Sequence, residues 1–212
     1  MQTTPSFRLN DAPLHLLSDH FIDRQKEMDQ ILSSLDMLYG DIPTRCVVYG
    51  DHGVGKTQLA IKLAASTMPQ RRYPCIFWIP ASTIEGLRES FTQLLHSVRH
   101  PARAHPDEDT RLTEAQRWLE DVASGQWLLI LDNVTRQAVA FLREHLPRRN
   151  KDGQILFTTL MEHVALALAH VSGEKHSTIR LCMPDVEDAA HLLLEHFTNA
   201  TLTWMQARPG RS

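Results

Sequence analysis

Residues 45 to 60 read RCVVYGDHGVGKTQLA, and the fold of the chain can be worked out from this stretch. Within it, residues 50 to 57 (GDHGVGKT) satisfy the Walker A pattern G-x-x-x-x-G-K-[ST]. Glycines let several backbone N–H groups turn towards one anion, because no Cβ stands in the way. The lysine adds a mobile positive charge, and the threonine adds a hydroxyl that can bind Mg²⁺. The stretch therefore predicts a site for the phosphates of a nucleotide.

The sequence on either side of this motif supports that interpretation. Residues 46 to 49 are an apolar run typical of a buried parallel strand, and residues 58 to 66 combine good helix formers with several apolar residues. A helix that begins near Gly55 would direct its free N–H groups and the positive end of its dipole at the phosphates. The alternative is a glycine turn that only joins a strand to a helix. The loop residues predicted to bind the nucleotide are Gly50, Gly53, Val54, Gly55, Lys56, Thr57 and Gln58.

Composition describes an ordinary globular chain and argues against two classes of partner. The 212 residues have a formal net charge of −3, so no basic excess points to nucleic acid or to an anionic membrane. No apolar run approaches the ~20 residues of a membrane span, and the N-terminus lacks the pattern of a signal peptide. The three cysteines are far apart and lie in predicted strands, which indicates a reducing compartment and a cytoplasmic location. The twelve histidines form no cluster with metal-ligand spacing.

The chain begins with a segment of weak pattern and then becomes periodic. Residues 1 to 18 are predicted to be a poorly ordered lead-in, because they mix two prolines with polar residues. Apolar side chains at helical spacing then predict a helix over residues 24 to 38. The folded domain is expected to cover residues 19 to 198, followed by an unstructured tail over residues 199 to 212.

Further strands and helices alternate after the Walker A helix. Strands are predicted over residues 74–79, 127–131, 153–159 and 178–183. Helices are predicted after a cap at Ser82, over residues 113–123, 136–146 and 162–170, and from Pro184 onwards. Residues 99 to 110 are expected to be a long surface connection.

The strand over residues 127 to 131 is apolar throughout and is followed by Asp132. This is the Walker B arrangement, in which a buried strand brings a carboxylate towards Mg²⁺ or its water shell. Asp132 and Thr57 are therefore the predicted metal residues. Two interpretations of the Thr158-Thr159 pair stay open: threonines simply favour strand ends, or a hydroxyl contacts the γ-phosphate or the attacking water. The predicted catalytic residues are Asp132, Lys56 and Thr158.

Five strands that alternate with helices predict an α/β fold of three layers, with a mainly parallel sheet between two layers of helices. One whole strand and two helices separate the Walker A strand from the Walker B strand, which suggests the ASCE branch of P-loop NTPases. With the strands numbered along the chain, the expected order in the sheet is 5-1-4-3-2.

Taken together, these motifs resemble the NB-ARC (STAND-class) NTPase domain of NLR-type proteins, and the similarity is closest to fungal and bacterial versions. The resemblance covers residues 20 to 198. Besides Walker A and Walker B, it includes residues 21 to 27 (FIDRQKE), which are similar to the family's hydrophobic-Gly-Arg-Glu motif, and Thr158-Thr159 on the sensor strand. Residues 181 to 192 are similar to a helix motif of the family.

The resemblance implies a signalling switch that holds ADP at rest, exchanges it for ATP, and acts through self-association or through association with full-length relatives. It implies that Ile22 packs on the adenine and that Arg24 lies near the nucleotide. It also implies that Lys56 and Thr57 hold phosphates and Mg²⁺, and that Asp132 acts through the metal.

Several positions depart from the family pattern. Asp23 and Gln25 stand where the family has glycine and glutamate. Asn133 replaces a second acid after the Walker B aspartate, and Leu160 replaces an arginine after the two threonines. Because both missing groups would assist attack on the γ-phosphate, we expect slow hydrolysis or none.

Three functions remain open at the level of sequence. The leading hypothesis is an ADP/ATP-binding switch, with the chain truncated before the family's helical and winged-helix subdomains. The alternative is an active P-loop ATPase or small-molecule kinase, and the third hypothesis is a remnant that binds nothing.

Overall fold

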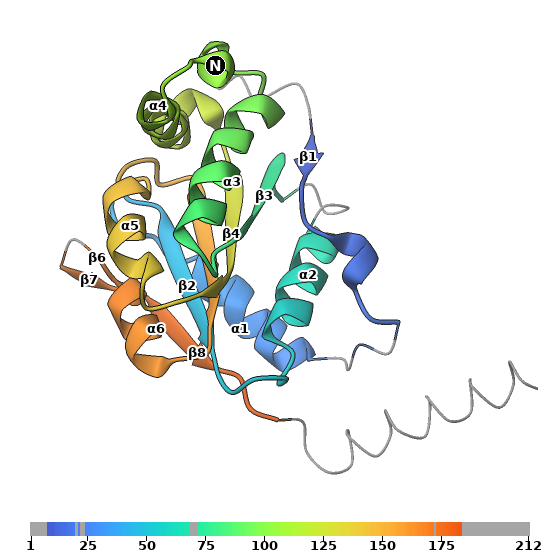
Figure 1. The fold of residues 1–212 in the computed structure, drawn as a ribbon. Helices are drawn as coiled ribbons and strands as arrows, with labels where there is room; N and C mark the ends of the chain where they lie inside the picture. The colour runs from blue at the N-terminus through green and yellow to red at the C-terminus, as the bar shows by residue number, and fades with distance from the viewer. Residues whose placement is uncertain (1–7, 20, 22–23, 68–71, 172, 184–212) are drawn as a thin grey trace, which may run out of the picture.

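A parallel sheet of six strands forms the centre of the molecule, in the order β1-β3-β4-β5-β2-β8 (Figure 1). The computed structural model describes residues 8–19, 21, 24–67, 72–171 and 173–183. The strands are β1 (Leu9–Asn10), β2 (Thr44–Tyr49), β3 (Cys75–Pro80), β4 (Trp127–Val134), β5 (Gly153–Thr159) and β8 (Ser177–Arg180). The helices are α1 (Gln25–Leu35), α2 (Lys56–Thr67), α3 (Ile84–Ser97), α4 (Glu108–Glu120), α5 (Ala138–His145) and α6 (Glu162–Ala169).

The two faces of the sheet are covered by different helices, as the three-layer prediction requires. Side chains of α1 and α2 pack on one face against residues such as Val48 and Ile130. The helices α3 to α6 pack on the other face against residues such as Val47 and Leu129. Successive strand residues point to opposite faces, so a strand buried on both faces must be apolar throughout. This explains the apolar runs over residues 46–49 of β2 and 127–131 of β4.

The predicted α/β class and the predicted order of five strands are confirmed. In chain order the predicted strands correspond to β2, β3, β4, β5 and β8, and 5-1-4-3-2 becomes β8-β2-β5-β4-β3. The sixth strand, β1, comes from the segment expected to be a poorly ordered lead-in. Within residues 8 to 18 the structure differs from that expectation, because Leu9 and Asn10 pair in parallel with Cys75 and Ile76 of β3.

Several helix ends also differ from the sequence prediction. The helix α4 begins at Glu108 rather than at residue 113, because the Asp107 side chain accepts a hydrogen bond from the Thr110 N–H and caps the helix. Thr83, not Ser82, caps α3 by accepting from the Gly86 N–H. Residues 99 to 110 contain a short 3-10 helix, Pro101–Ala104. The helix predicted from Pro184 and the predicted tail lie outside the described residues.

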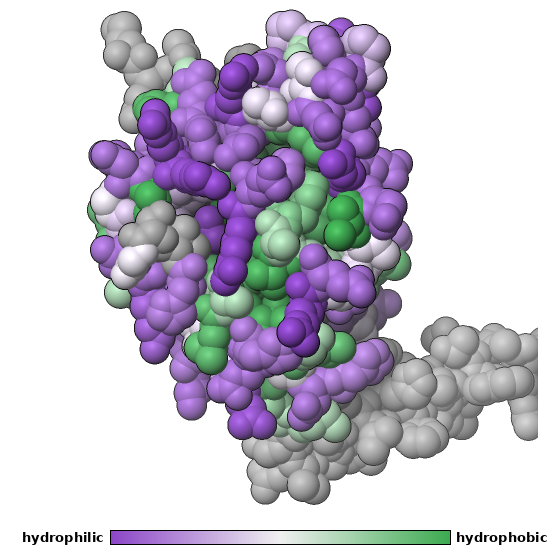
Figure 2. Space-filling view, turned by 60° about the vertical axis from the view of Figure 1, so that its left-hand side comes forward, coloured by the Kyte–Doolittle hydropathy of each residue, from purple (hydrophilic) through white to green (hydrophobic). Residues whose placement is uncertain are grey.

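Smaller elements complete the description. Two further 3-10 helices cover Leu14–Leu16 and Val122–Ser124, and a small antiparallel pair is formed by β6 (His170–Val171) and β7 (Glu174–Lys175). Seen from the side of α5 and α6, the surface is mostly hydrophilic, with hydrophobic residues gathered near its centre (Figure 2). Within the described ranges, no helix is long and apolar enough to cross a membrane.

Candidate functional site

The loop between β2 and α2 has the shape that phosphate binding requires. Gly53 and Gly55 have φ angles of +81° and +95°, which side chains with a Cβ rarely adopt. The helix α2 begins directly at Lys56. The free N–H groups of its first turn and the positive end of its dipole therefore lie at the loop. Val54, a residue of the loop itself, is buried, with 2% of its surface exposed.

The Lys56 side chain folds back onto this loop and binds its backbone. Its Nζ donates to the carbonyl oxygens of Gly50 at 2.8 Å and of Asp51 at 2.7 Å. These bonds use two of the three N–H donors of the ammonium group. Burial lowers the pKa of Lys56, while the nearby carboxylates of Asp132 and Asp51 act in the opposite direction. A partly desolvated cation beside the free N–H groups at the start of α2 is a strong attractor for a phosphate.

Asp132 lies across the site from the start of α2 and is held by two hydroxyl groups. The Thr57 hydroxyl donates to the Asp132 carboxylate, with Oγ1 at 2.9 Å from Oδ1 and at 3.1 Å from Oδ2. The Thr158 hydroxyl donates to Oδ1 at 2.6 Å. The structure thus brings together the three predicted residues that come from the Walker A helix, the Walker B strand and the sensor strand.

An irregularity at the end of β4 sets the direction of this carboxylate. The register between β4 and β5 shifts between Leu131 and Val134, and Asn133 has a φ of +61°. Asparagine tolerates this left-handed conformation better than most residues. The Asn133 N–H donates to the Thr158 Oγ1 at 2.8 Å, and the Thr159 hydroxyl donates to the Val134 carbonyl at 2.7 Å. The two threonines therefore fasten the bulged end of β4 to β5.

The hydrogen bonds of Thr158 bear on the two interpretations left open by the sequence. Its hydroxyl proton is directed at Asp132, and its oxygen accepts from the Asn133 backbone. Thr158 is also buried, with 1% of its surface exposed. This arrangement suits a residue that orients Asp132 better than one that contacts a phosphate.

A pocket of about 370 Å³ opens above these groups. It is lined by His52, Gly53, Gly55, Lys56, Thr57, Gln58, Asp132, Asn133, Thr158 and Leu160. Among the lining residues that the structure describes, Lys56 supplies an ammonium group and Asp132 supplies a carboxylate.

The oxygen atoms at the base of the pocket fit a small divalent cation. Neighbouring ligands of an octahedral Mg²⁺ ion, with bonds of about 2.0–2.1 Å, lie roughly 3 Å apart. The Thr57 and Asp132 oxygens lie 2.9 Å apart in a direct hydrogen bond, a separation that hydrogen bonds and pairs of metal ligands share. In the described part of the chain, no three His, Cys, Asp or Glu side chains gather as a metal site. A metal ion here would therefore depend on phosphate oxygens and water as well.

Arg24 and Gln58, both predicted to lie at the nucleotide, make hydrogen bonds to backbone groups of the chain. One Arg24 nitrogen, Nη2, donates to the carbonyl oxygens of Val54 and Cys182, both at 3.1 Å. Arg24 therefore joins the phosphate loop to the chain that leaves β8, and it lies beside the loop. The Gln58 side chain donates to the Leu16 carbonyl at 2.9 Å and accepts from the Ser18 N–H at 2.8 Å. Ile22, predicted to pack on the adenine, lies outside the described residues.

Sequence reasoning missed part of this arrangement. His52 occupies one of the unspecified positions of the Walker A pattern, and nothing in the pattern itself predicts that this residue lines the pocket. The attachment of residues 16 and 18 to Gln58 also has no local signal, because the partners lie about 40 residues apart in the chain.

The chain is similar in sequence to a known protein family and to a known fungal protein. A family model described as NB-ARC domain matches residues 24–201. A nucleotide-binding leucine-rich repeat (NLR)-like protein from Hyaloscypha variabilis is 25% identical over 220 residues, a match that covers 88% of this chain and 22% of that protein. The chain therefore spans about a fifth of the length of that relative.

Two solved structures are also similar. The crystal structure of Cdc6p from Pyrobaculum aerophilum superposes with a TM-score of 0.59 at 14% identity, over 84% of this chain and 52% of that one. The Aeropyrum pernix ORC2 protein, in ADPNP–ADP complexes, gives a TM-score of 0.49 at 13% identity, over 81% of this chain and 49% of that one. The first likeness shows a shared fold.

Proposed function

The chain belongs to the NB-ARC family, and from that premise we propose that it is an ADP- and ATP-binding switch module with slow or absent hydrolysis. The observation that carries the proposal is the meeting of Lys56, Thr57 and Asp132 around one pocket at the start of α2. Backbone amides of the loop would bind the β-phosphate, and Lys56 would neutralise its charge. Thr57 and Asp132 would hold Mg²⁺, which supplies positive charge to the phosphate oxygens.

The proposal of slow hydrolysis rests on two residues that line the pocket. Asn133 has no carboxylate to take a proton from an attacking water, and Leu160 has no positive charge to stabilise the γ-phosphate in the transition state. A site that binds nucleotide but turns it over poorly is suited to a switch, because the bound state persists until exchange.

The biological setting is part of the proposal. A member of this family with an NLR-like relative would act in signal transduction of the innate-immunity or cell-death type, in the cytoplasm, and would respond to nucleotide exchange by self-association or by association with full-length NLR-like proteins.

Purified protein tests the nucleotide proposal directly. The protein is denatured, any released nucleotide is identified by chromatography, and phosphate release is measured on fresh protein. We expect retained ADP and little phosphate release. The Lys56→Ala variant should lose nucleotide binding by roughly 100-fold or more, because the loop loses the cation that it encloses.

The matched control is Lys62→Ala, which removes an exposed lysine from the same helix. This variant should bind nucleotide as the parent chain does. Steady turnover that Lys56→Ala abolishes would favour the active ATPase or kinase instead. A chain that binds no nucleotide at millimolar supply would contradict both proposals.

A further inference from the structure

Arg24 is a positively charged residue that lies beside the phosphate loop and is buried, with 9% of its surface exposed. Its Nη2 atom donates to the carbonyl oxygens of Val54 and Cys182, both at 3.1 Å. Its Nη1 atom lies 3.3 Å from the Glu27 carboxylate, which offsets its charge. Arg24 is not among the residues described as lining the phosphate pocket. The guanidinium group is therefore held by bonds within the protein, outside the lining of the pocket.

The bond to the Val54 carbonyl sets the direction of the next N–H group in the loop. In a trans peptide, the C=O of one residue and the N–H of the following residue point in opposite directions. Since the Val54 carbonyl points to Arg24, the Gly55 N–H points away from Arg24. Gly55 lines the pocket, and its N–H has no hydrogen-bond acceptor among the described residues. This N–H is therefore free to bind an anion in the pocket.

Other contacts hold the rest of the loop around this peptide. The Val54 side chain belongs to the apolar core that α1 and α2 form with the sheet. Lys56 holds the first part of the loop, since its Nζ donates to the carbonyl oxygens of Gly50 and Asp51. The Val54 carbonyl is held by Arg24 instead. Arg24 and Lys56 therefore act on different peptides of the same loop.

Hydrogen bonds at the two ends of one peptide strengthen each other. A donor on the C=O polarises the peptide and makes its N–H a stronger donor, and a charged donor has the larger effect. The bond from Arg24 to the Val54 carbonyl thus strengthens the Gly55 N–H as a donor to an anion. A bound anion would in return make the Val54 carbonyl a better acceptor for Arg24. Arg24 and a bound phosphate would therefore stabilise each other without contact.

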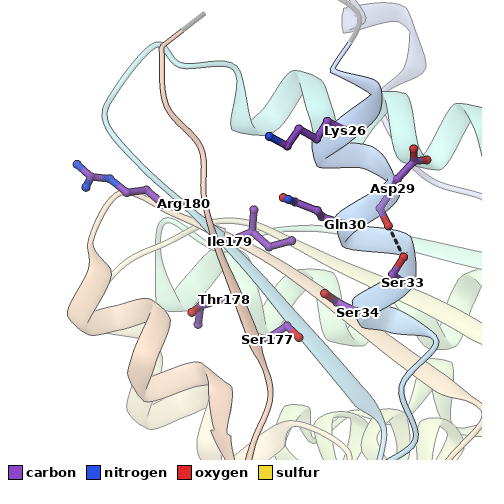
Figure 3. Close-up of a pocket in the computed structure, with 9 residues that line it drawn as sticks. All are labelled: Lys26, Asp29, Gln30, Ser33, Ser34, Ser177, Thr178, Ile179 and Arg180. Carbon is purple, nitrogen blue, oxygen red and sulfur yellow. Dashed lines mark hydrogen bonds between the residues drawn. The ribbon is translucent and has the colours of Figure 1, made fainter.

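The second bond of Arg24 extends this effect to the end of β8. A groove of about 980 Å³ separates α1 from β8, and Lys26 and Arg180 lie at one end of it (Figure 3). Ile179 is the one apolar side chain of its nine lining residues, so little apolar packing crosses the groove. Among the described residues, only the hydrogen bond from Arg24 to Cys182 joins the start of α1 to the chain that leaves β8. A firmer hold on Arg24 would therefore restrain Cys182.

We propose that Arg24 is a positioning residue for the phosphates of the nucleotide, and that it links the occupancy of the loop to the chain that leaves β8. It acts through the Val54–Gly55 peptide and needs no contact with the nucleotide. The proposal rests on the nucleotide binding proposed above, and it adds a role for a residue outside the pocket lining.

Titration of the full chain with ADP and Mg²⁺ tests the role at the loop. Arg24→Met keeps an apolar stem in the buried position and removes the donors. It should bind ADP about 10-fold more weakly, because a hydrogen bond from a charged group to the loop is lost. Lys26→Met is the matched control, since it removes an exposed positive charge two residues along the chain, and it should bind ADP as the parent does. A urea unfolding transition shows that each variant is folded, and Arg24→Gln replaces Arg24→Met if that variant does not fold.

Cys182 provides a native reporter for the link to β8. Its thiol is exposed, whereas Cys46 and Cys75 are buried, so a maleimide should label Cys182 in the folded chain. Saturating ADP should slow this labelling in the parent chain by about twofold or more, because bound phosphate strengthens the hold of Arg24. Arg24→Met, saturated with ADP, should show no such change. Direct shielding of the thiol by the nucleotide would persist in this variant.

The possible results separate the two proposals. ADP binding that Arg24→Met leaves unchanged would overturn the role at the loop, and an equal loss in Lys26→Met would show that positive charge alone is responsible. Labelling that ADP does not alter in the parent chain, or alters equally in Arg24→Met, would overturn the link to β8. A parent chain that binds no ADP would overturn the proposed function, and this proposal with it.

Discussion

At the scale of single residues, the candidate site depends most on how the Asp132 carboxylate is oriented. Its carboxylate receives hydrogen bonds from Thr57 and Thr158, which belong to two different elements. Asn133 completes this group, because its left-handed backbone aims an N–H at Thr158. A partner that orients a metal-binding carboxylate typically changes metal affinity by 10- to 100-fold when it is removed.

Thr158→Val tests whether this hydroxyl orients Asp132 or contacts the γ-phosphate. We expect Mg²⁺-dependent binding of ADP and of ATP to weaken by the same factor, about 10-fold, because both nucleotides need the same metal position. Thr158→Ser retains the hydroxyl and should behave as the parent chain does. Competition titrations with both nucleotides measure the two affinities, and a loss confined to ATP would favour the phosphate contact.

Asn133→Asp tests the cause of the proposed slow hydrolysis. Aspartate tolerates the same backbone conformation and supplies the missing acid, so phosphate release should rise by roughly 100-fold if the base is what the site lacks. Asn133→Gly is the control, because it keeps the backbone and adds no acid. Equal rates for all three proteins would exclude this explanation.

The sequence could predict that Lys56, Thr57 and Asp132 lie together, because the two Walker motifs specify a local geometry. It could not predict what Arg24 contacts, because the carbonyl groups of Val54 and Cys182 come together only in the folded chain. The same holds for Gln58, which is adjacent to Thr57 but binds backbone groups of residues 16 and 18.

At the scale of elements, long apolar runs were the reliable signal. The run in β4 gave the start of that strand correctly at Trp127, and the predicted bounds of β5 also agree with the structure, although its apolar run covers only residues 155 to 157. The strand β1 has only two residues and no such run, so its pairing with β3 depends on tertiary context. The start of α4 was missed because the Asp107 cap lies among histidines and prolines that suggested a loop.

The start of β5 provides a test of packing between strands. A Cβ added to Gly153 would lie 2.2 to 2.6 Å from three atoms of the Trp127 indole ring. Trp127 is fully buried, and its Nε1–H donates to the Leu119 carbonyl at 3.1 Å, so the ring cannot move away freely. Gly153→Ala should therefore lower the free energy of unfolding by about 3 kcal/mol.

Urea denaturation measures this change. Combining Gly153→Ala with Trp127→Phe should cost less than the sum of the two single changes, because the smaller ring leaves room for the methyl group. Strict additivity would show that the methyl group does not meet the ring.

At the scale of the whole molecule, the candidate nucleotide site and the acid-sensitive residue His176 lie at opposite ends of the sheet. The phosphate loop and Asp132 lie at the carboxyl ends of β2 and β4, while Arg45 and His176 lie near the starts of β2 and β8. His176 is buried, its Nδ1 accepts from the Arg45 N–H at 3.2 Å, and its ring packs against the Tyr39 ring at a tilt of 47°, with centroids 4.1 Å apart. Its Nε2 has no hydrogen-bond partner among the described residues.

This environment makes stability depend on pH in a defined direction. Burial, reinforced by the positive charge of Arg45, lowers the pKa of His176 from 6.5 to about 4. Between these values the unfolded chain binds a proton at His176 and the folded chain does not. Stability is therefore fully present above pH 6.5 and falls as the pH is lowered towards 4, by up to about 3 kcal/mol from this group.

Urea denaturation between pH 7 and pH 4.5 checks the expected slope by comparing the parent chain with His176→Phe. The phenylalanine keeps a ring beside Tyr39 but loses the bond to the Arg45 N–H, so the variant should be less stable at pH 7 by about 1–2 kcal/mol. It should lose less stability than the parent on acidification, because it has no group to protonate there. Carboxylates titrate in both proteins, so their effect cancels when the free energies of unfolding of the two proteins are subtracted. If the two stability curves stay parallel throughout this range, His176 is not the group responsible.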